Sequence, residues 1–139
     1  MTVMNDIRAA LDEHLRTATG LPAIVFDRQP YTQDGDTPYL RARMIPTSRR
    51  AAVTGPAPQK RIQGLYQIVI CVPDGKGSGL AYDYADIVLA RFNAHTDIDS
   101  PLTGVDTPVS LEYSEVGTPF DDPPFFCLPV DVAWYAYEN

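Results

Sequence analysis

The sequence predicts an α+β fold, in which a largely antiparallel or mixed β-sheet carries two α-helices packed on one face. Apolar residues recur at helical spacing in two segments and form strand-like runs in five others, in the order α-β-β-β-α-β-β. Hairpin-like connections on both sides of the second helix favour antiparallel pairing. With 139 residues, 45% of them hydrophobic, the chain has the size of one domain, so we expect a single domain over residues 1–139.

The first predicted helix begins near Asn5 or Asp6, either of which can cap it, and ends before Gly20 and Pro22. Its buried face carries the residues at helical spacing, which are Ile7, Ala10, Leu11, His14, Leu15 and Ala18. The helix is therefore amphipathic.

Two strands are predicted next. Residues 23–27 form a short apolar run that ends in a turn-rich stretch. Residues 39–45 alternate, with Leu40, Ala42 and Met44 on one face and Tyr39, Arg41 and Arg43 on the other. This second strand is half-buried, and its two outward arginines need water or a partner.

A long loop is expected over residues 46–60, which contain three prolines and no apolar periodicity. Residues 61–72 then form the strongest strand of the sequence. A glycine-rich turn at 73–79 leads into a helix over 80–95. Its predicted stripe consists of Leu80, Tyr84, Val88 and Phe92, beside Ala81, Ala85 and Leu89.

The last two strands differ in their outer faces. Residues 109–116 alternate, with Val109, Leu111 and Tyr113 against a polar face. The run 125–137 is apolar on both faces, which predicts that one of them meets another chain. Aromatic residues are favoured at interface cores, so the predicted subunit interface uses Trp134, Tyr135 and Tyr137.

Charge is distributed unevenly along the chain. The net charge of -7 argues against nonspecific binding of nucleic acid or anionic membranes. Residues 37–61 nevertheless hold six basic side chains and no acid, whereas residues 62–139 hold two basic and twelve acidic ones. This pattern fits either a solvated basic loop or a cationic arm that meets an acidic surface, such as a neighbouring copy, or nucleic acid passing nearby.

Cysteine and histidine spacing predicts no metal site. Cys71 and Cys127 lie far apart in apolar runs, and we expect buried free thiols rather than a disulfide. His14 and His95 have no partner at metal-ligand spacing. No apolar run is long enough to span a membrane, and the start of the chain lacks the layout of a signal peptide.

No catalytic signature is present, so we expect a protein that is not an enzyme and needs no cofactor. The turn DGKGSG lies between a strand and a helix, where phosphate-binding loops occur, but Lys76 is followed by Gly77 and the Walker spacing fails. Ser78 does not form the GxSxG nucleophile elbow either. A flexible turn is the simpler interpretation.

Three stretches carry a resemblance to a known family: TPYLRARMIP (37–46), RIQGLYQIVICVP (61–73), and the DGKGSG turn leading into AYDYADIVLARF. They resemble the tail terminator proteins of bacteriophages with long noncontractile tails. The resemblance runs from the first helix to about Phe92, and the last third agrees in strand layout.

The resemblance implies a structural virion protein. It would form a ring, expected to be a hexamer, that caps the tail tube, stops its polymerisation and offers a surface for head attachment. Its implied partners are further copies of itself, the tail tube protein and a head-completion or neck protein, with DNA passing through the channel without specific binding. It would lie at the head-proximal end of the tail after assembly in the host cytoplasm. We expect Arg49, Arg50, Lys60 and Arg61, in and beside the basic loop, to contact the tube.

Two alternatives stay open. The chain could be a neck or head-completion protein that joins capsid and tail. It could also be a small phosphate-ligand-binding enzyme that uses the glycine turn at 73–79.

Overall fold

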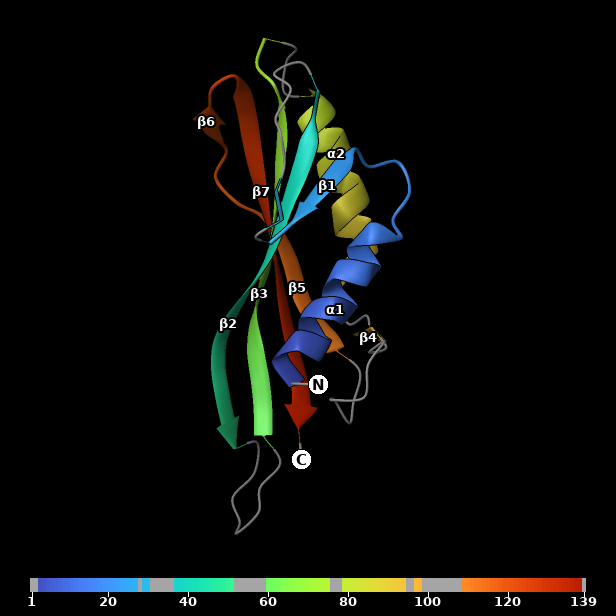
Figure 1. Ribbon diagram of the computed structural model, residues 1–139, viewed down its shortest axis with the longest axis vertical. Coiled ribbons are helices and arrows are strands. Elements are labelled where there is room, and N and C mark those ends of the chain that lie inside the picture. Colours follow the sequence, from blue (N-terminus) through green and yellow to red (C-terminus); the bar gives the residue numbers. More distant parts are fainter. Residues whose placement is uncertain are drawn as a thin grey trace.

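A computed structural model of the chain describes residues 3–27, 29–30, 37–51, 60–75, 79–94, 97–98 and 109–138 (Figure 1). Its elements are α1 (Val3–Arg16), β1 (Ala23–Phe26), β2 (Tyr39–Ala51), β3 (Lys60–Pro73), α2 (Gly79–Arg91), β4 (Asp97–Ile98), β5 (Val109–Val116), β6 (Phe120–Asp122) and β7 (Phe125–Glu138). The predicted α+β class and the order α-β-β-β-α-β-β are confirmed. The short strands β4 and β6 are additions that the sequence pattern did not predict.

The strands form one mixed sheet in the order β1-β2-β3-β7-β5-β4, with β6 paired to β7. Only β1 and β2 run parallel, and the other pairs are antiparallel. The two central strands, β3 and β7, are each 14 residues long and pair along their whole length. These two strands therefore form the centre of the sheet.

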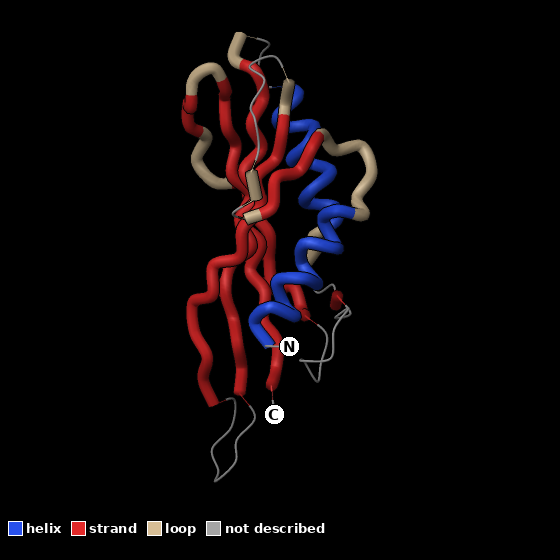
Figure 2. The backbone as a smooth tube through the Cα atoms, in the orientation of Figure 1, coloured by secondary structure: helices blue, strands red, loops and turns tan. Residues whose placement is uncertain are grey.

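Both helices lie on the same side of the sheet (Figures 1 and 2). Alternate residues of β3 and β7 point toward them and are completely buried; these are Tyr66, Ile68, Ile70, Leu128, Val130, Val132 and Trp134. The helices bury Ile7, Ala10, Leu11 and Leu15 from α1, and Ala81, Ala85 and Val88 from α2, with Phe92 just after its end. Burying this apolar layer between sheet and helices is the main stabilising term of the fold.

Two details of the helices differ from the predicted ones. Helix α1 begins at Val3, so Asn5 and Asp6 lie inside its first turn instead of capping it. In α2 the buried stripe is rotated, since Ala81 is fully buried while Leu80 is 37% exposed. Small alanines and not the larger Leu80 therefore face the sheet.

The predicted loop at 46–60 is shorter than expected. Residues 46–51 continue strand β2, because a register shift between Pro46 and Ser48 lets the chain keep pairing with β3. Gly64 makes this possible: a Cβ there would lie 2.5 Å from the Ile45 carbonyl oxygen and 2.8 Å from Trp134 Cζ2. Residues 52–59, the remainder of that loop apart from Lys60, lie outside the described residues.

A second irregularity lies in β5, between Leu111 and Tyr113. The extra residue shifts the alternation, so Leu111 is buried as predicted but Tyr113 is 44% exposed. Asp121 and Asp122 belong to the short strand β6, which adds to the edge of β7.

A polar junction fixes the two helices to each other. His14 Nε2 lies 2.7 Å from the Arg91 carbonyl oxygen, and Arg91 Nε donates to the His14 carbonyl oxygen at 2.9 Å. Burial lowers the pKa of His14, and the nearby Arg91 charge lowers it further, against the opposing effect of the hydrogen bond. Beside it, the Tyr66 hydroxyl donates to Asp12 Oδ1 at 2.6 Å. Burial raises the pKa of both Tyr66 and Asp12, although the hydrogen bonds to Asp12 oppose its shift.

Candidate functional site

The face of the sheet opposite the helices, here called the open face, is the candidate site. Side chains alternate along a strand, so the residues between the core positions point away from the helices. On the three neighbouring strands β2, β3 and β7 these residues include Arg41, Arg43, Gln67, Val69, Cys71, Cys127, Pro129, Asp131 and Tyr135. Their mixture of charge, amide and aromatic groups differs from the apolar layer on the other side.

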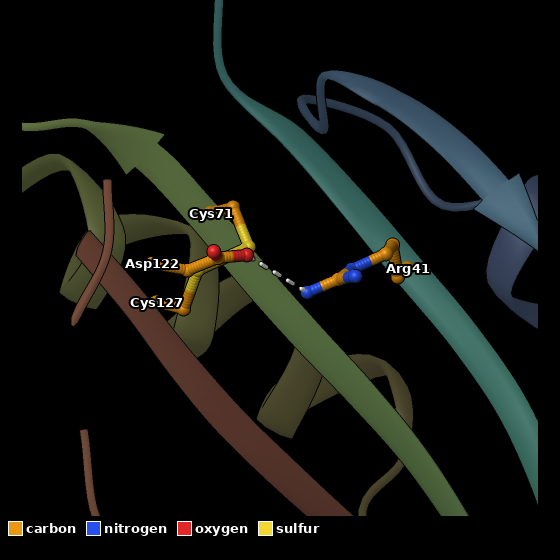
Figure 3. Close-up of a disulfide and its surroundings, with 4 residues drawn as sticks. All are labelled: Arg41, Cys71, Asp122 and Cys127. Carbon is orange, nitrogen blue, oxygen red and sulfur yellow. Dashed lines mark ion pairs between the residues drawn. A yellow bond between two sulfur atoms is a disulfide. The ribbon is translucent and has the colours of Figure 1, made fainter. Parts of the chain in front are cut away.

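A disulfide joins Cys71 of β3 to Cys127 of β7 at one end of this face (Figure 3). The prediction of free thiols is therefore wrong. The two residues are 56 positions apart in sequence, but the antiparallel register places them directly opposite, with their Cα atoms 4.2 Å apart. Tyr39 and Phe125 pack edge to face beside the bridge, 5.1 Å between ring centroids, and complete a small second core.

Arg41 lies next to this small core. Its Nη2 atom is 3.8 Å from Asp122 Oδ2 of β6, and both side chains are about half exposed, 44% and 50% (Figure 3). A surface pair at this distance contributes little, about 0–1 kcal/mol. Arg41 is therefore held only loosely on the open face.

A hydrogen-bonded row crosses the middle of the open face. Arg43 Nε and Nη2 donate to Gln67 Oε1 at 3.2 and 3.1 Å, and Gln67 Nε2 donates to Asp131 Oδ1 at 3.2 Å. The three residues come from the adjacent strands β2, β3 and β7. Within the described part of the chain, the Arg43 guanidinium thus bonds a neutral amide and has no carboxylate within ion-pair distance.

A groove of about 680 Å³ runs over these residues. It extends from the end of β1 across β2 and β3 to β6. Its lining is Val25, Phe26, Asp27, Gln29, Arg41, Ala42, Arg43, Gln67, Val69, Phe120 and Pro129. Two arginines and one aspartate leave the lining with a net positive charge, and Phe120, 43% exposed, offers an aromatic surface at its rim.

The structure brings the four predicted basic residues together. The β2–β3 register places Arg49 opposite Ile62, Arg50 opposite Arg61, and Ala51 opposite Lys60. All four lie where β2 ends and β3 begins, at the end of the molecule that holds both termini (Figure 1). The grouping comes from the strands themselves, because residues 46–51 belong to β2.

Arg61 contacts an aromatic ring and approaches a carboxylate. Its guanidinium carbon stacks 4.3 Å from the centre of the Tyr135 ring, and Nη2 lies 3.9 Å from Glu112 Oε2. Arg61 Nε is buried and has no hydrogen-bond partner among the described residues. Tyr135 in turn contacts Tyr137 edge to face, with 5.9 Å between ring centroids.

Trp134 does not belong to the predicted interface with Tyr135 and Tyr137. It is completely buried in the main core, next to Gly64, and its indole Nε1 has no hydrogen-bond partner in the described part of the chain. The reason is the strand alternation, which turns Trp134 toward the helices and its neighbour Tyr135 toward the open face. Tyr135 and Tyr137 are half-buried and remain candidates.

The other chemical candidates receive no support from the described residues. In the glycine turn, the Gly75 amide donates to Asp74 Oδ1 and Gly75 has a φ of +88°, while residues 76–78, including Lys76 and Ser78, lie outside what is described. His95 is likewise outside it. The described chain holds no group of three or more His, Cys, Asp or Glu side chains placed to bind a metal ion, and none of its helices has the length and apolarity to cross a membrane.

Comparisons with known proteins give a consistent result. A family model described as "Phage tail terminator protein" matches residues 6–134. No curated protein matches the chain. A solved structure with 21% sequence identity superposes with a TM-score of 0.72 and covers 100% of this chain and 98% of its own, which shows that the fold is shared.

Proposed function

The chain belongs to the phage tail terminator protein family, and from this membership we propose that six copies close into a ring that caps the tail tube. Proteins of this family are structural components of the bacteriophage tail, where they interact with tail and head components. The observation that carries the proposal is the family match over residues 6–134, nearly the whole chain. In the assembled particle the ring would lie at the head-proximal end of the tail, after assembly in the host cytoplasm.

The physical task of such a ring is to end a polymer. A tube grows by a repeating contact that never closes along its axis, so length control needs a subunit that matches the last tube ring on one side only. The opposite side of the cap then presents a new surface, to which the head can attach. Binding alone suffices for this task, and no catalytic step is required.

The end of the subunit with Arg49, Arg50, Lys60 and Arg61 is the proposed tube contact. These four basic residues lie where β2 ends and β3 begins. Their positive charge is opposite in sign to the net charge of the chain, which is -7. Charge complementarity of this kind speeds association and fixes the orientation of a partner. An acidic rim on the tube would therefore be recognised by this end and not by the rest of the acidic subunit.

The open face is the proposed site of contact between subunits, with Tyr135 and Tyr137 among its aromatic groups. A ring of acidic copies would also let DNA pass through its channel without specific binding, since like charges repel.

Electron microscopy of the purified protein, alone and mixed with tail tubes, tests the function. We expect rings, and rings seated on tube ends. Binding to capsid portals and not to tubes would favour the neck or head-completion role instead. A phosphate-dependent rise in melting temperature that Lys76→Ala removes would favour the enzyme alternative.

The double variant Arg49→Glu and Arg50→Glu tests the tube contact. We expect rings to form normally but to cap tubes poorly, so that tails assembled with this variant vary in length. Arg16→Glu is the control, because Arg16 is an exposed cation on α1, 64% accessible and paired with Glu13 of its own helix. Normal tail lengths and infectivity in the double variant would remove these arginines from the mechanism.

A further inference from the structure

The solvent side of α2 carries an acidic and aromatic patch, defined here as Leu80, Tyr82, Asp83 and Asp86. Leu80 is 37% and Tyr82 45% exposed, and both aspartates are exposed. Within the described residues neither aspartate takes part in an ion pair. The patch therefore combines uncompensated negative charge with apolar surface that has no cover in the single subunit.

The groove on the open face has the opposite character. Within the part of the chain that the structure describes, its Arg43 bonds only the neutral amide of Gln67, and its Arg41 lies at a long 3.8 Å from Asp122. Apolar surface from Val25, Phe120 and Pro129 lies beside these cations. The groove thus offers positive charge beside apolar surface, which complements the negative charge and apolar surface of the α2 patch.

The two surfaces are placed on opposite sides of the subunit. Helix α2 covers one side of the sheet, whereas Arg41, Arg43 and Gln67 alternate with the core positions and point to the other side. The start of α2 and the groove both lie in the half of the molecule that holds β1 and β6 (Figure 1). A copy can therefore offer its α2 patch at one side while it receives another copy at the other.

We propose that these surfaces are the two halves of one contact: the α2 patch of each copy docks into the groove of the next copy. The inference rests on the proposed ring and specifies the surfaces that close it. Because the two halves differ, the contact is head-to-tail, which is the type that generates a closed ring when its rotation fits. A second copy is the favoured occupant because each chain brings both members of the complementary pair in equal number.

Charge reversal with complementation tests the contact. In Arg43→Glu the groove becomes acidic and repels the patch of its neighbour, and in the double variant Asp83→Lys with Asp86→Lys the patch becomes basic and repels the groove. We expect each variant alone to form rings only at a protein concentration at least about tenfold higher than the wild type, because a like-charge juxtaposition opposes docking. In an equimolar mixture, copies alternate around an even-numbered ring so that every groove meets a patch of opposite sign, and we expect rings to return.

Mass photometry over a concentration series and negative-stain images give the readout, and circular dichroism checks that each variant is folded. Arg16→Glu, with the same change of charge as Arg43→Glu but outside both surfaces, is expected to form rings like the wild type. Wild-type rings that neither reversal affects, or variants that fail to complement each other, would overturn this contact while leaving the ring intact. A wild-type protein that stays monomeric at every concentration would overturn the ring and this contact together.

Discussion

The two faces of the central strands differ in how completely the subunit satisfies them. Toward the helices, β3 and β7 present a continuous apolar layer that includes Ile68, Val130 and Trp134, all fully buried. On the open face, neighbouring residues of the same strands carry Gln67, Asp131 and other groups that water still reaches. The same two strands therefore carry a buried apolar core on one side and a partly exposed polar surface on the other.

The difference indicates where a partner is needed. The sheet face beneath the helices is completely buried within one chain, so an added protein cannot reach it. Among the described residues, the guanidinium of Arg43 on the open face bonds an amide alone, and the buried Arg61 Nε has no hydrogen-bond partner. Polar groups in this condition are stabilised by further contacts, which is consistent with a subunit that functions in an assembly.

The largest expected effect compares adjacent residues on the two faces. Trp134→Ala removes a fully buried side chain and should lower the free energy of unfolding by about 3–5 kcal/mol. Tyr135→Ala removes a half-buried ring stacked with Arg61 and should cost about 1–2 kcal/mol in the isolated subunit. Urea unfolding followed by circular dichroism measures both. Fluorescence does not serve here, because Trp134 is the single tryptophan and Trp134→Ala removes it. Equal losses would show that the two faces are equally important to the fold.

The next effect concerns the small core that strengthens one end of the open face. Reduction of the Cys71–Cys127 bridge frees a loop with a sequence separation of 56, so we expect it to lower the free energy of unfolding by about 2–4 kcal/mol. The variant Cys71→Ala with Cys127→Ala should be destabilised and should not respond to reductant. Thiol labelling of the unfolded wild type without reductant checks the bond itself. Two labelled thiols, and a stability that reductant leaves unchanged, would contradict it.

The helix side of the fold could be predicted from the sequence because its signals are local. The alternation of residues 61–72 and of Phe126 to Trp134 needs only neighbouring residues, and it places the core correctly. The same alternation separates Trp134 from Tyr135, so their joint assignment to an interface overlooked a signal that the sequence contains. The irregularities at Pro46/Ser48 and Leu111/Tyr113 could not be predicted in the same way, since they depend on the fit between paired strands.

The contacts on the open face depend on pairing between strands that are distant in sequence. The sequence therefore predicted only some of them. Arg41 and Arg43 were correctly placed as outward residues of one strand. Their neighbours could not be named, because the bond to Gln67 and the approach of Asp122 follow from the order and register of strands distant in sequence. The disulfide is the clearest case, since only the β3–β7 register brings Cys71 and Cys127 together.

The smallest effect tests a polar region of the helix side, the junction between α1 and α2. Burial lowers the pKa of His14 below its ordinary value of 6.5, so the folded protein binds this proton more weakly than the unfolded chain does. The contribution of His14 is therefore fully present above the unfolded pKa and is lost as the pH falls from there toward the lowered folded value.

We expect the wild type to lose stability between pH 7 and pH 5 through this residue, and His14→Gln to lose less over the same interval. Asp12 acts in the opposite direction, because its raised pKa makes the folded state bind its proton more tightly and so favours folding as the pH falls. Comparing the two proteins at each pH cancels the effect of Asp12 and isolates His14. Parallel curves of unfolding free energy against pH for the two proteins would show that protonation of His14 does not disturb the junction with Arg91.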